Sequence, residues 1–563
     1  MKNNLLLIFV LITLSNVFSQ ENRTLNYDEL IEVYNNLAKD NEEIQLFNMG
    51  ASDYGLPIYL CLINAGSDST TAFESARNSN TLLINNAIHP GEPDGVNACL
   101  NWINEWVNNG KKIKNLPVIA IIPAYNVGGM MNRSGTSRAN QDGPEEYGFR
   151  GNSQNLDLNR DFIKMDSKNM FTFSKIYHSI EPDVFLDTHV SNGADYQYTM
   201  TYIASVRERM APSMVALMDD EMLPFVKKYN QKQGIDITPY VNLKSDVPEK
   251  GIELFNDLPR YAMGYTSLFN SLSFTLETHM LKPFPERVKA TEVFISGTIE
   301  WMKNSQKLID HARQEAQKWE NELSLYKYNY ELTNDADSIL FKGFEYDYIK
   351  SNVTGLKRLK YYEDKPYEKY VPFYRSFQAL DSVMVPEYFV VGGQCKDVIE
   401  KLSANKVEFK MISEPKQIRL NSQRIVSFES PEVPYEGHFL HSNVAYQTKK
   451  ENVSLKQGDV IVPTNQKNKR FILSVLTPDA PDSYFVWNSF DSYLQQKEYF
   501  SPYVFEEKAE EILLKNPKLK KEFELKKETD LEFNNSEWSQ LYFIYKNSEF
   551  FEPTYFLLPV YSF

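Results

Sequence analysis

Short apolar runs alternate with amphipathic stretches between about residues 25 and 325. Asp94 follows the first of four notable runs and is placed to cap a helix, in which apolar side chains recur at helical spacing from Val96 to Val107. A long helical segment covers about residues 286–323. The four runs contain few polar positions, as expected of strands buried on both faces of a sheet: residues 81–88, 118–123, 183–188 and 272–276. The pattern predicts an α/β fold in which helices cover both faces of a central sheet.

The composition and the hydrophobic pattern of the chain change after about residue 325. Aromatic side chains become dense and strand-like runs become shorter. Residues 388–412 read as a strand, a glycine turn, a helix and a second strand, and Gly458 begins a turn into another strand. We expect the aromatic runs at residues 484–487 and 499–503 to fill a β-rich core, the alternative being a peptide or glycan groove. This predicts a first domain over residues 20–325, followed by an accessory, aromatic-rich α+β region over residues 326–563.

The N-terminus has the pattern of an export signal. Lys2 precedes an apolar run of about ten residues, from Leu5 to Leu14, and small residues follow where a signal peptidase would cut. The run is too short for a bilayer, which needs about 20 apolar residues, and no later stretch reaches that length. We therefore expect a signal peptide over residues 1–19, a mature chain without a transmembrane segment, and a periplasmic or secreted location.

Net charge and cysteine content exclude a nucleic-acid partner and a disulfide framework. The 563 residues carry a net charge of −15 with a pI near 5.2, so the chain has no broad basic surface for nucleic acid. Its three cysteines, Cys61, Cys99 and Cys395, have apolar surroundings. An odd number this small in a long chain cannot form a disulfide framework. We expect the three to be buried as small hydrophobic side chains.

Three potentially reactive side chains fall at the ends of predicted strands. His89 follows the first apolar run, His189 follows the third, and Glu277 ends the fourth. In α/β sheets, ligand sites form where the loops leave one set of strand ends. The sequence therefore predicts that these three residues meet at one site.

His89 and Glu92 form a His-x-x-Glu motif on a loop that leaves a strand. Zinc takes such mixed nitrogen and oxygen ligands, and three protein ligands with one water are its hydrolytic arrangement. His189 is the candidate for the third ligand. Taken singly, the motif also fits a polar surface turn, and His189 fits a hydrogen-bonded core histidine. His279 would share a strand face with Glu277, which leaves open a substrate contact or an alternative ligand role.

A polar segment between the two zinc-ligand candidates carries arginines suited to binding anions. Asn159 stands beside Arg160, and a guanidinium fork with an adjacent amide can clasp a carboxylate. Arg150, at the head of the same segment, is placed to polarise a scissile carbonyl and to hold the oxyanion. Arg133 and Arg138 are further candidates for that role.

In this order, the motifs resemble those of the zinc carboxypeptidase family of metallopeptidases over roughly residues 25–310. The resemblance implies a mixed, mainly parallel central sheet. It also implies that Glu277 acts as general base and then as general acid. Its zinc ligands, one Zn²⁺ per chain, would be His89, Glu92 and His189. By the same resemblance, supporting roles fall to Asp157 beside the first zinc histidine, to Arg150 at the oxyanion, and to Asn159 and Arg160 at the substrate's terminal carboxylate.

The family also places a tyrosine on a mobile loop ahead of the catalytic glutamate. Tyr261 and Tyr265 both fit this position, and Tyr265 ranks first because it follows a glycine. The stretch between them offers no acid for a basic substrate side chain. This favours a neutral or apolar C-terminal residue in the substrate.

These features predict an exported zinc metallocarboxypeptidase that acts on peptides with a free C-terminal carboxylate. Glu277 and zinc would activate the water that attacks the peptide bond. One alternative keeps the zinc and the fold but changes the bond, giving an amidase or a murein-peptide hydrolase. A second alternative, from another class, is a non-catalytic binding protein that has inherited the scaffold.

Overall fold

An eight-stranded mixed sheet forms the centre of the first half of the chain, with strand order β1-β2-β4-β3-β5-β10-β6-β7. Its four middle strands, β4, β3, β5 and β10, are parallel neighbours. Antiparallel pairs join β1 to β2, β2 to β4 and β10 to β6. The strands span Ile44–Ala51 (β1), Pro57–Ile63 (β2), Thr81–Asn85 (β3), Val118–Ile122 (β4), Val184–Ser191 (β5), Met200–Ala204 (β6), Ile237–Pro239 (β7) and Leu272–His279 (β10). The predicted mixed, mainly parallel sheet is confirmed, and the four apolar runs supply its parallel middle.

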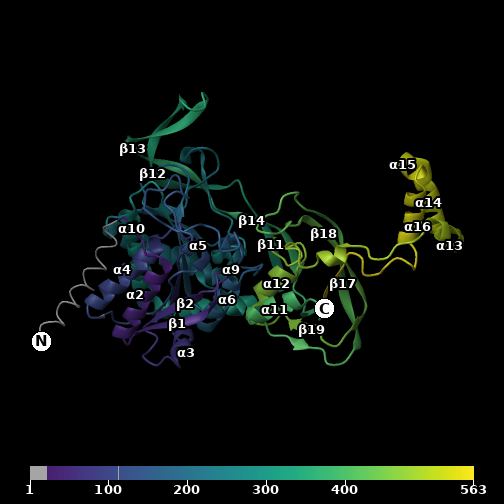
Figure 1. Ribbon diagram of the computed structural model, residues 1–563, viewed down its shortest axis with the longest axis horizontal. Coiled ribbons are helices and arrows are strands. Elements are labelled where there is room, and N and C mark those ends of the chain that lie inside the picture. Colours follow the sequence, from purple (N-terminus) through teal and green to yellow (C-terminus); the bar gives the residue numbers. More distant parts are fainter. Residues whose placement is uncertain (1–21, 112) are drawn as a thin grey trace.

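The computed structural model describes residues 22–111 and 113–563, so the predicted signal peptide lies outside the described residues. In Figure 1 the sheet and its helices form one body, and the second half of the chain packs beside it. The helices α13 to α16 stand apart at the end of two extended connections (Figure 1). Within the described residues, no helix combines the length and the apolarity that a membrane span requires.

Helices cover both faces of the sheet, as β5 demonstrates. Phe185 of β5 packs its ring against Phe173 of α6, with 6.0 Å between the centroids. Thr188 lies three positions further along, hence on the opposite face, against Gly95 of α4. A Cβ at residue 95 would come within 2.1 Å of the Thr188 hydroxyl oxygen, so this close approach requires glycine. The helices of the first half span Tyr27–Asp40 (α2), Ala72–Arg77 (α3), Asp94–Asn108 (α4), Val127–Met131 (α5), Lys168–Ile180 (α6), Pro212–Ala216 (α7), Leu223–Lys232 (α8), Ala262–Ser267 (α9) and Phe284–Glu322 (α10).

Asp94 does not cap α4, contrary to the sequence prediction. Pro93 occupies the cap position, and Asp94 is the first residue of the helix. Its buried carboxylate accepts hydrogen bonds from Thr278 of β10 and from Arg287 of α10, the latter at 2.9 Å. The acid thus ties three elements together in the core, because the fully buried Arg287 needs a charged partner there.

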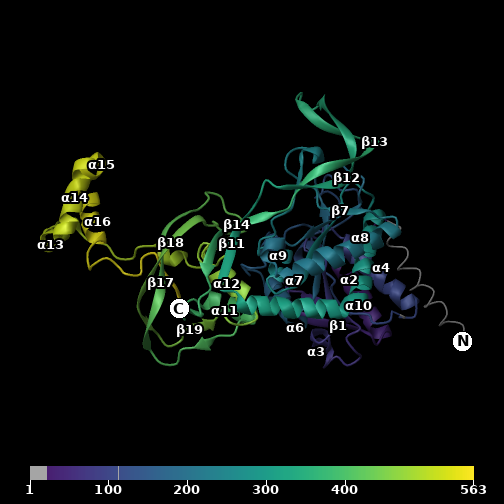
Figure 2. The same ribbon diagram turned by 180° about the vertical axis from the view of Figure 1, so that it is seen from behind.

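The 39-residue helix α10 links the two halves of the chain (Figure 2). At its C-terminal end the ammonium group of Lys469, which begins α12, donates to the carbonyls of Glu320 and Asn321 at 2.7 and 2.9 Å. A lysine at this position satisfies carbonyls that lack a partner within the helix. The helix end is therefore completed by the second half.

The second half contributes strands to three sheets, one of which it shares with the first half. β11 (Leu325–Leu332) pairs with β14 (Phe377–Met384), and a long hairpin of β12 (Ala336–Lys350) and β13 (Lys357–Tyr374) joins β9 (Ile252–Glu253) and β8 (Asn242–Leu243) of the first half. A six-stranded sheet contains β15 (Tyr388–Val391), β16 (Lys410–Met411), β17 (Lys416–Glu429), β18 (Ser442–Leu455), β19 (Val460–Pro463) and β20 (Leu557–Ser562). The helices are α11 (Lys396–Ala404), α12 (Lys469–Leu476), α13 (Pro502–Lys515), α14 (Pro517–Thr529), α15 (Leu531–Asn534) and α16 (Glu537–Lys546).

Much of the predicted pattern of the second half is present. The expected strand, turn, helix and strand over residues 388–412 are β15, α11 and β16, and Gly458 leads into β19. Residues 484–487 are buried, as expected of core aromatics, and all three cysteines are buried and free. The second aromatic run fits the prediction only in part: Phe500 packs against a small core formed by α13 to α16, whereas Tyr499 and Tyr503 are exposed.

Candidate active site

The ends of β3 and β5 bring His89, Glu92 and His189 together in a buried cluster. The Nδ1 atoms of the two histidines are 3.1 Å apart, and Glu92 Oε2 lies 3.0 Å from His189 Nδ1 and 3.4 Å from His89 Nδ1. Ligands bonded to zinc at about 2.0–2.2 Å in a tetrahedron lie about 3.3 Å from one another. The three ligand atoms therefore fit one zinc ion.

Each histidine uses its second ring nitrogen to bond a carboxylate. His89 Nε2 lies 2.9 Å from Asp157 Oδ1, and His189 Nε2 lies 2.7 Å from Asp187 Oδ2. A carboxylate in this position fixes the tautomer and orientation of a zinc-binding imidazole. Sequence reasoning identified Asp157 but missed Asp187. The signal was present, because Asp187 precedes His189 by two residues on a strand and so shares its face.

Charged neighbours hold Glu92 in its ionised form. Burial opposes its charge, but Arg138 and His89 outweigh the burial and lower the pKa of Glu92 well below the ordinary value. Arg138 donates to Glu92 Oε1 at 2.7 Å, and the backbone N–H of Val190 donates to Oε2 at 3.0 Å. Arg138, considered above for the oxyanion role, thus holds a candidate ligand instead.

Glu277 stands next to His189 across the β10–β5 ladder. It lines the same pocket of about 210 Å³ as the His-Glu-His cluster, and its side chain remains partly exposed to that pocket. Loss of hydration is the main cause that raises the pKa of Glu277 to about 8, and the nearby Glu92 raises it further, whereas His189 and Arg138 oppose the shift. A carboxyl group whose pKa lies near neutrality is suited to accept and return a proton.

Arg150, Asn159 and Arg160 line this pocket as well. Arg150 is half-exposed, and its Nε donates to Asp157 Oδ2 at 2.9 Å. Asn159 Oδ1 accepts from the backbone N–H of Ala262 at 3.0 Å, which fixes the amide group. The Arg160 guanidinium lies over the Tyr261 ring, 4.6 Å from its centroid. The segment that was expected to bind anions therefore faces the candidate zinc ligands.

Tyr265 does not line the pocket, and its assignment to substrate contact is wrong. The side chain is fully buried among aromatic rings, and its hydroxyl group donates to Asn405 Oδ1. Gly264, whose position before Tyr265 suggested mobility, belongs to α9, and a Cβ there would meet the Leu258 carbonyl oxygen at 2.2 Å. The glycine permits close packing and is not a hinge. Tyr261, the other candidate, does line the pocket.

Two further sequence candidates lie elsewhere. Arg133 donates to the backbone carbonyls of Thr24, Leu25 and Glu146, which accounts for its position. His279 is buried against the Tyr196 ring and points to Asp195, 3.5 Å from Nε2. In contrast, Tyr240 was not singled out from the sequence, yet it lines the pocket. Its pKa is raised, mainly by burial and in addition by the nearby charge of Glu277.

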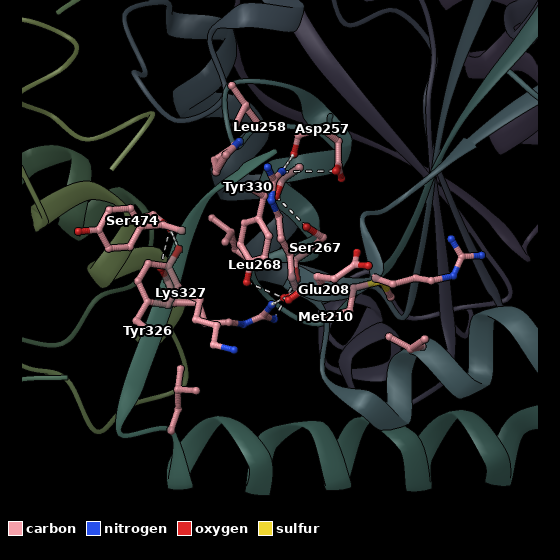
Figure 3. A pocket seen from close by; sticks show the side chains of 18 of the residues that line it. Glu208, Met210, Asp257, Leu258, Ser267, Leu268, Tyr326, Lys327, Tyr330 and Ser474 are labelled. Atoms are coloured by element: carbon pink, nitrogen blue, oxygen red, sulfur yellow. Dashed lines mark hydrogen bonds and ion pairs between the residues drawn. The ribbon is translucent and has the colours of Figure 1, made fainter. Parts of the chain in front are cut away.

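A larger cavity of about 820 Å³ lies between the two halves (Figure 3). Its wall and that of the zinc pocket share the segment 255–264, with Asp257 and Leu258 facing the cavity and Phe255 and Tyr261 facing the pocket. Polar groups of the cavity already bond one another, as the Tyr330 hydroxyl does to the Glu208 carbonyl. The groups suited to hydrolysis gather in the smaller pocket, which we take as the active site.

Metal-ligand geometry and fold together place the protein among zinc-dependent hydrolases built on a mixed α/β sheet. Residues 30–351 match the model of the family described as zinc carboxypeptidase. Since this match covers more than half of the chain, the protein belongs to the zinc carboxypeptidase family, and it is a zinc metallopeptidase.

Solved structures give weaker likenesses. A metallo-carboxypeptidase from Burkholderia cenocepacia is 16% identical, with 48% of this chain and 68% of that chain covered and a TM-score of 0.36. Carboxypeptidase A from Helicoverpa armigera is 16% identical, with 53% and 75% covered and a TM-score of 0.35. A comparison with curated protein sequences gives no significant match.

Proposed function

We propose that the protein hydrolyses the last peptide bond of substrates that end in a free α-carboxylate. One observation carries the proposal: Asn159 and Arg160 line the same pocket of about 210 Å³ as Glu277 and the His-Glu-His cluster. A guanidinium fork beside an amide recognises a carboxylate, and its place in the pocket sets which bond of the substrate reaches the metal.

The residues divide the chemistry between them. When bound by His89, Glu92 and His189, zinc supplies a Lewis acid that polarises the scissile carbonyl and lowers the pKa of water. Glu277 takes the proton of the attacking water and returns it to the leaving amine. Arg150 bonds Asp157 through Nε, and its Nη1 lies 3.5 Å from Glu92 Oε1, so the N–H groups of Nη2 remain to donate to the oxyanion as it forms.

Apolar side chains favour a neutral or apolar C-terminal residue in the substrate. Ile203, Phe255 and Met263 line the pocket, whereas its two acids are Glu92 and Glu277, which the chemistry requires. An arginine or lysine side chain would therefore lack a free acidic partner among the lining residues.

We also propose that the chain is exported to a periplasm or to the medium. The support is the N-terminal sequence, in which a basic residue, a short apolar run and small residues follow one another. N-terminal sequencing of the protein from a native source should begin near Gln20.

Two blocked dipeptides that differ only in a free or amidated C-terminus test the proposed activity. We expect the wild-type enzyme to cleave the acid and to leave the amide intact. Arg160→Ala should lower kcat/KM for the acid by roughly 100-fold, which corresponds to about 2.7 kcal/mol of lost carboxylate binding. Arg358→Ala, at an exposed position of β13, is the matched control and should retain full activity. Equal cleavage of acid and amide would contradict the proposal and favour an amidase.

A further inference from the structure

A loop of the second half reaches the carboxylate-binding segment of the first. The loop covers residues 430–441 and connects β17 to β18. Glu436 Oε2 accepts a hydrogen bond from the backbone N–H of Asp157 at 2.8 Å, and His438 Nε2 lies 2.6 Å from Asp166 Oδ2. These contacts flank Asn159 and Arg160 on both sides in sequence, about 270 residues away from the loop.

The side chain of Tyr435, from this loop, lies near the Arg160 guanidinium and interacts with it. Burial alone would lower the pKa of Arg160, but the Asp157 carboxylate, Tyr261 and a side-chain hydrogen bond with Tyr435 together raise it. Arg160 Nη1 also donates to the carbonyl of Asn159 at 2.8 Å, and the Tyr261 ring lies beneath the guanidinium. The guanidinium is thus held by groups from both halves of the chain.

Tyr435 is itself held in place by a buried aromatic frame. Its ring stacks with that of Trp487 at a centroid distance of 6.3 Å, and Trp487 Nε1 donates to Asp482 Oδ1 at 3.1 Å. Asp482 also binds Arg260, whose guanidinium lies over both aromatic rings. Since Trp487 is 2% exposed, the frame is fixed in the core and Tyr435 projects from it.

We propose that the loop 430–441 supports the carboxylate-binding segment from outside the pocket and that Tyr435 positions Arg160 for the terminal carboxylate. This inference rests on the proposed carboxypeptidase function and gives the second half a part in it. An arginine side chain loses considerable rotamer entropy when it is immobilised, and a residue that orients it beforehand reduces the cost of binding. The carboxylate takes no part in the bond changes of hydrolysis, so the contribution belongs to substrate binding and should change KM rather than kcat.

Tyr435→Phe tests the inference, because it keeps the ring in its frame and removes only the hydroxyl group. We expect KM for the free-acid dipeptide to rise roughly tenfold, the scale of one hydrogen bond to a charged group, with kcat nearly unchanged. In an Arg160→Ala background, the same substitution should add no further loss. Tyr503→Phe, at an exposed position of α13, is the matched control. If kcat and thermal stability both fall instead, Tyr435 has a merely structural role, and the inference is overturned.

Calorimetric binding to the zinc-loaded Glu277→Gln variant separates this inference from the proposed function. If this variant binds the free acid better than the amide, and Tyr435→Phe weakens the binding of the acid alone, both are supported. Unchanged binding after Tyr435→Phe overturns the inference and leaves the function standing. If the wild type cleaves neither dipeptide but Tyr435→Phe still weakens acid binding, the function fails and the inference stands. Binding of acid and amide with equal affinity contradicts both.

Discussion

At the scale of residues, the orientation of two imidazole rings decides which atoms can bind metal. His189 points Nδ1 towards Glu92 because Asp187 holds its Nε2 at 2.7 Å. Burial disfavours charge on His189, yet Asp187 and Glu92 raise its pKa well above the ordinary value in the absence of metal. Zinc and protons therefore compete for the same nitrogen, and zinc binding should release a proton near neutral pH.

Asp187→Asn should weaken zinc binding by about 10–100-fold, the usual effect of removing a carboxylate that orients a ligand histidine. Competition with a calibrated zinc chelator measures the affinity. Asp183→Asn serves as a control, since Asp183 precedes the same strand but bonds Arg313 and the backbone of Thr81. It should change stability without changing zinc affinity. Equal zinc affinity of Asp187→Asn and the wild type would contradict this account of the site.

At the scale of elements, the three strand ends explain why the sequence predicted the cluster. Short apolar runs with few polar positions marked β3, β5 and β10, and parallel strands bring their carboxyl ends to one edge. Local patterns were less informative where tertiary contacts decide the role. Asp94 had the sequence signature of a cap but pairs with Arg287 of α10, and Gly264 suggested mobility but serves close packing. Neither partner could be identified without the fold.

Arg287→Met should destabilise the protein by about 3–5 kcal/mol, because it leaves the Asp94 carboxylate buried without its charged partner. The substitution also removes donors to the carbonyls of Asp142, Gly143 and Lys282. Lys289→Met, two positions along α10, removes a surface pair with Glu292 and should cost less than about 1 kcal/mol. Denaturant unfolding of the metal-free proteins gives both values, and similar losses for the two variants would refute the structural role of the Asp94–Arg287 pair.

At the scale of the whole molecule, the two halves meet through buried polar contacts that join distant segments. Ser174 of α6 donates to the carbonyl of Ala404 at the end of α11, and His178 lies beside Asn405. The loop 430–441 makes a second connection between the halves, through its hydrogen bonds with Asp157 and Asp166. Composition alone predicted a separate accessory region and could not show these contacts, because residues hundreds of positions apart carry no local pattern for them.

His178 makes the connection between the halves sensitive to acid. Burial is the main cause that lowers the pKa of His178 to about 4, whereas the pKa in the unfolded chain is about 6.5. The unfolded state therefore binds a proton more readily than the folded state. The free energy of unfolding is highest above pH 6.5 and falls as the pH decreases towards 4. Between pH 7 and 5 this residue should cost about 2 kcal/mol of unfolding free energy. His178→Gln should remove that part of the pH dependence, whereas His311→Gln, at an exposed position of α10, should not. Parallel pH curves for the wild type and His178→Gln would contradict the prediction.

Zinc-dependent hydrolysis by Glu277 is tested by comparing the wild type with Glu277→Gln for zinc content and for hydrolysis of a free-acid dipeptide. We expect one zinc ion per chain in both proteins and loss of nearly all activity in the variant, because Glu277 moves protons but is not a ligand. A variant that retains zinc and cleaves at the wild-type rate would show that Glu277 is not the base. Absence of bound zinc in the active wild-type protein would contradict the assignment of His89, Glu92 and His189.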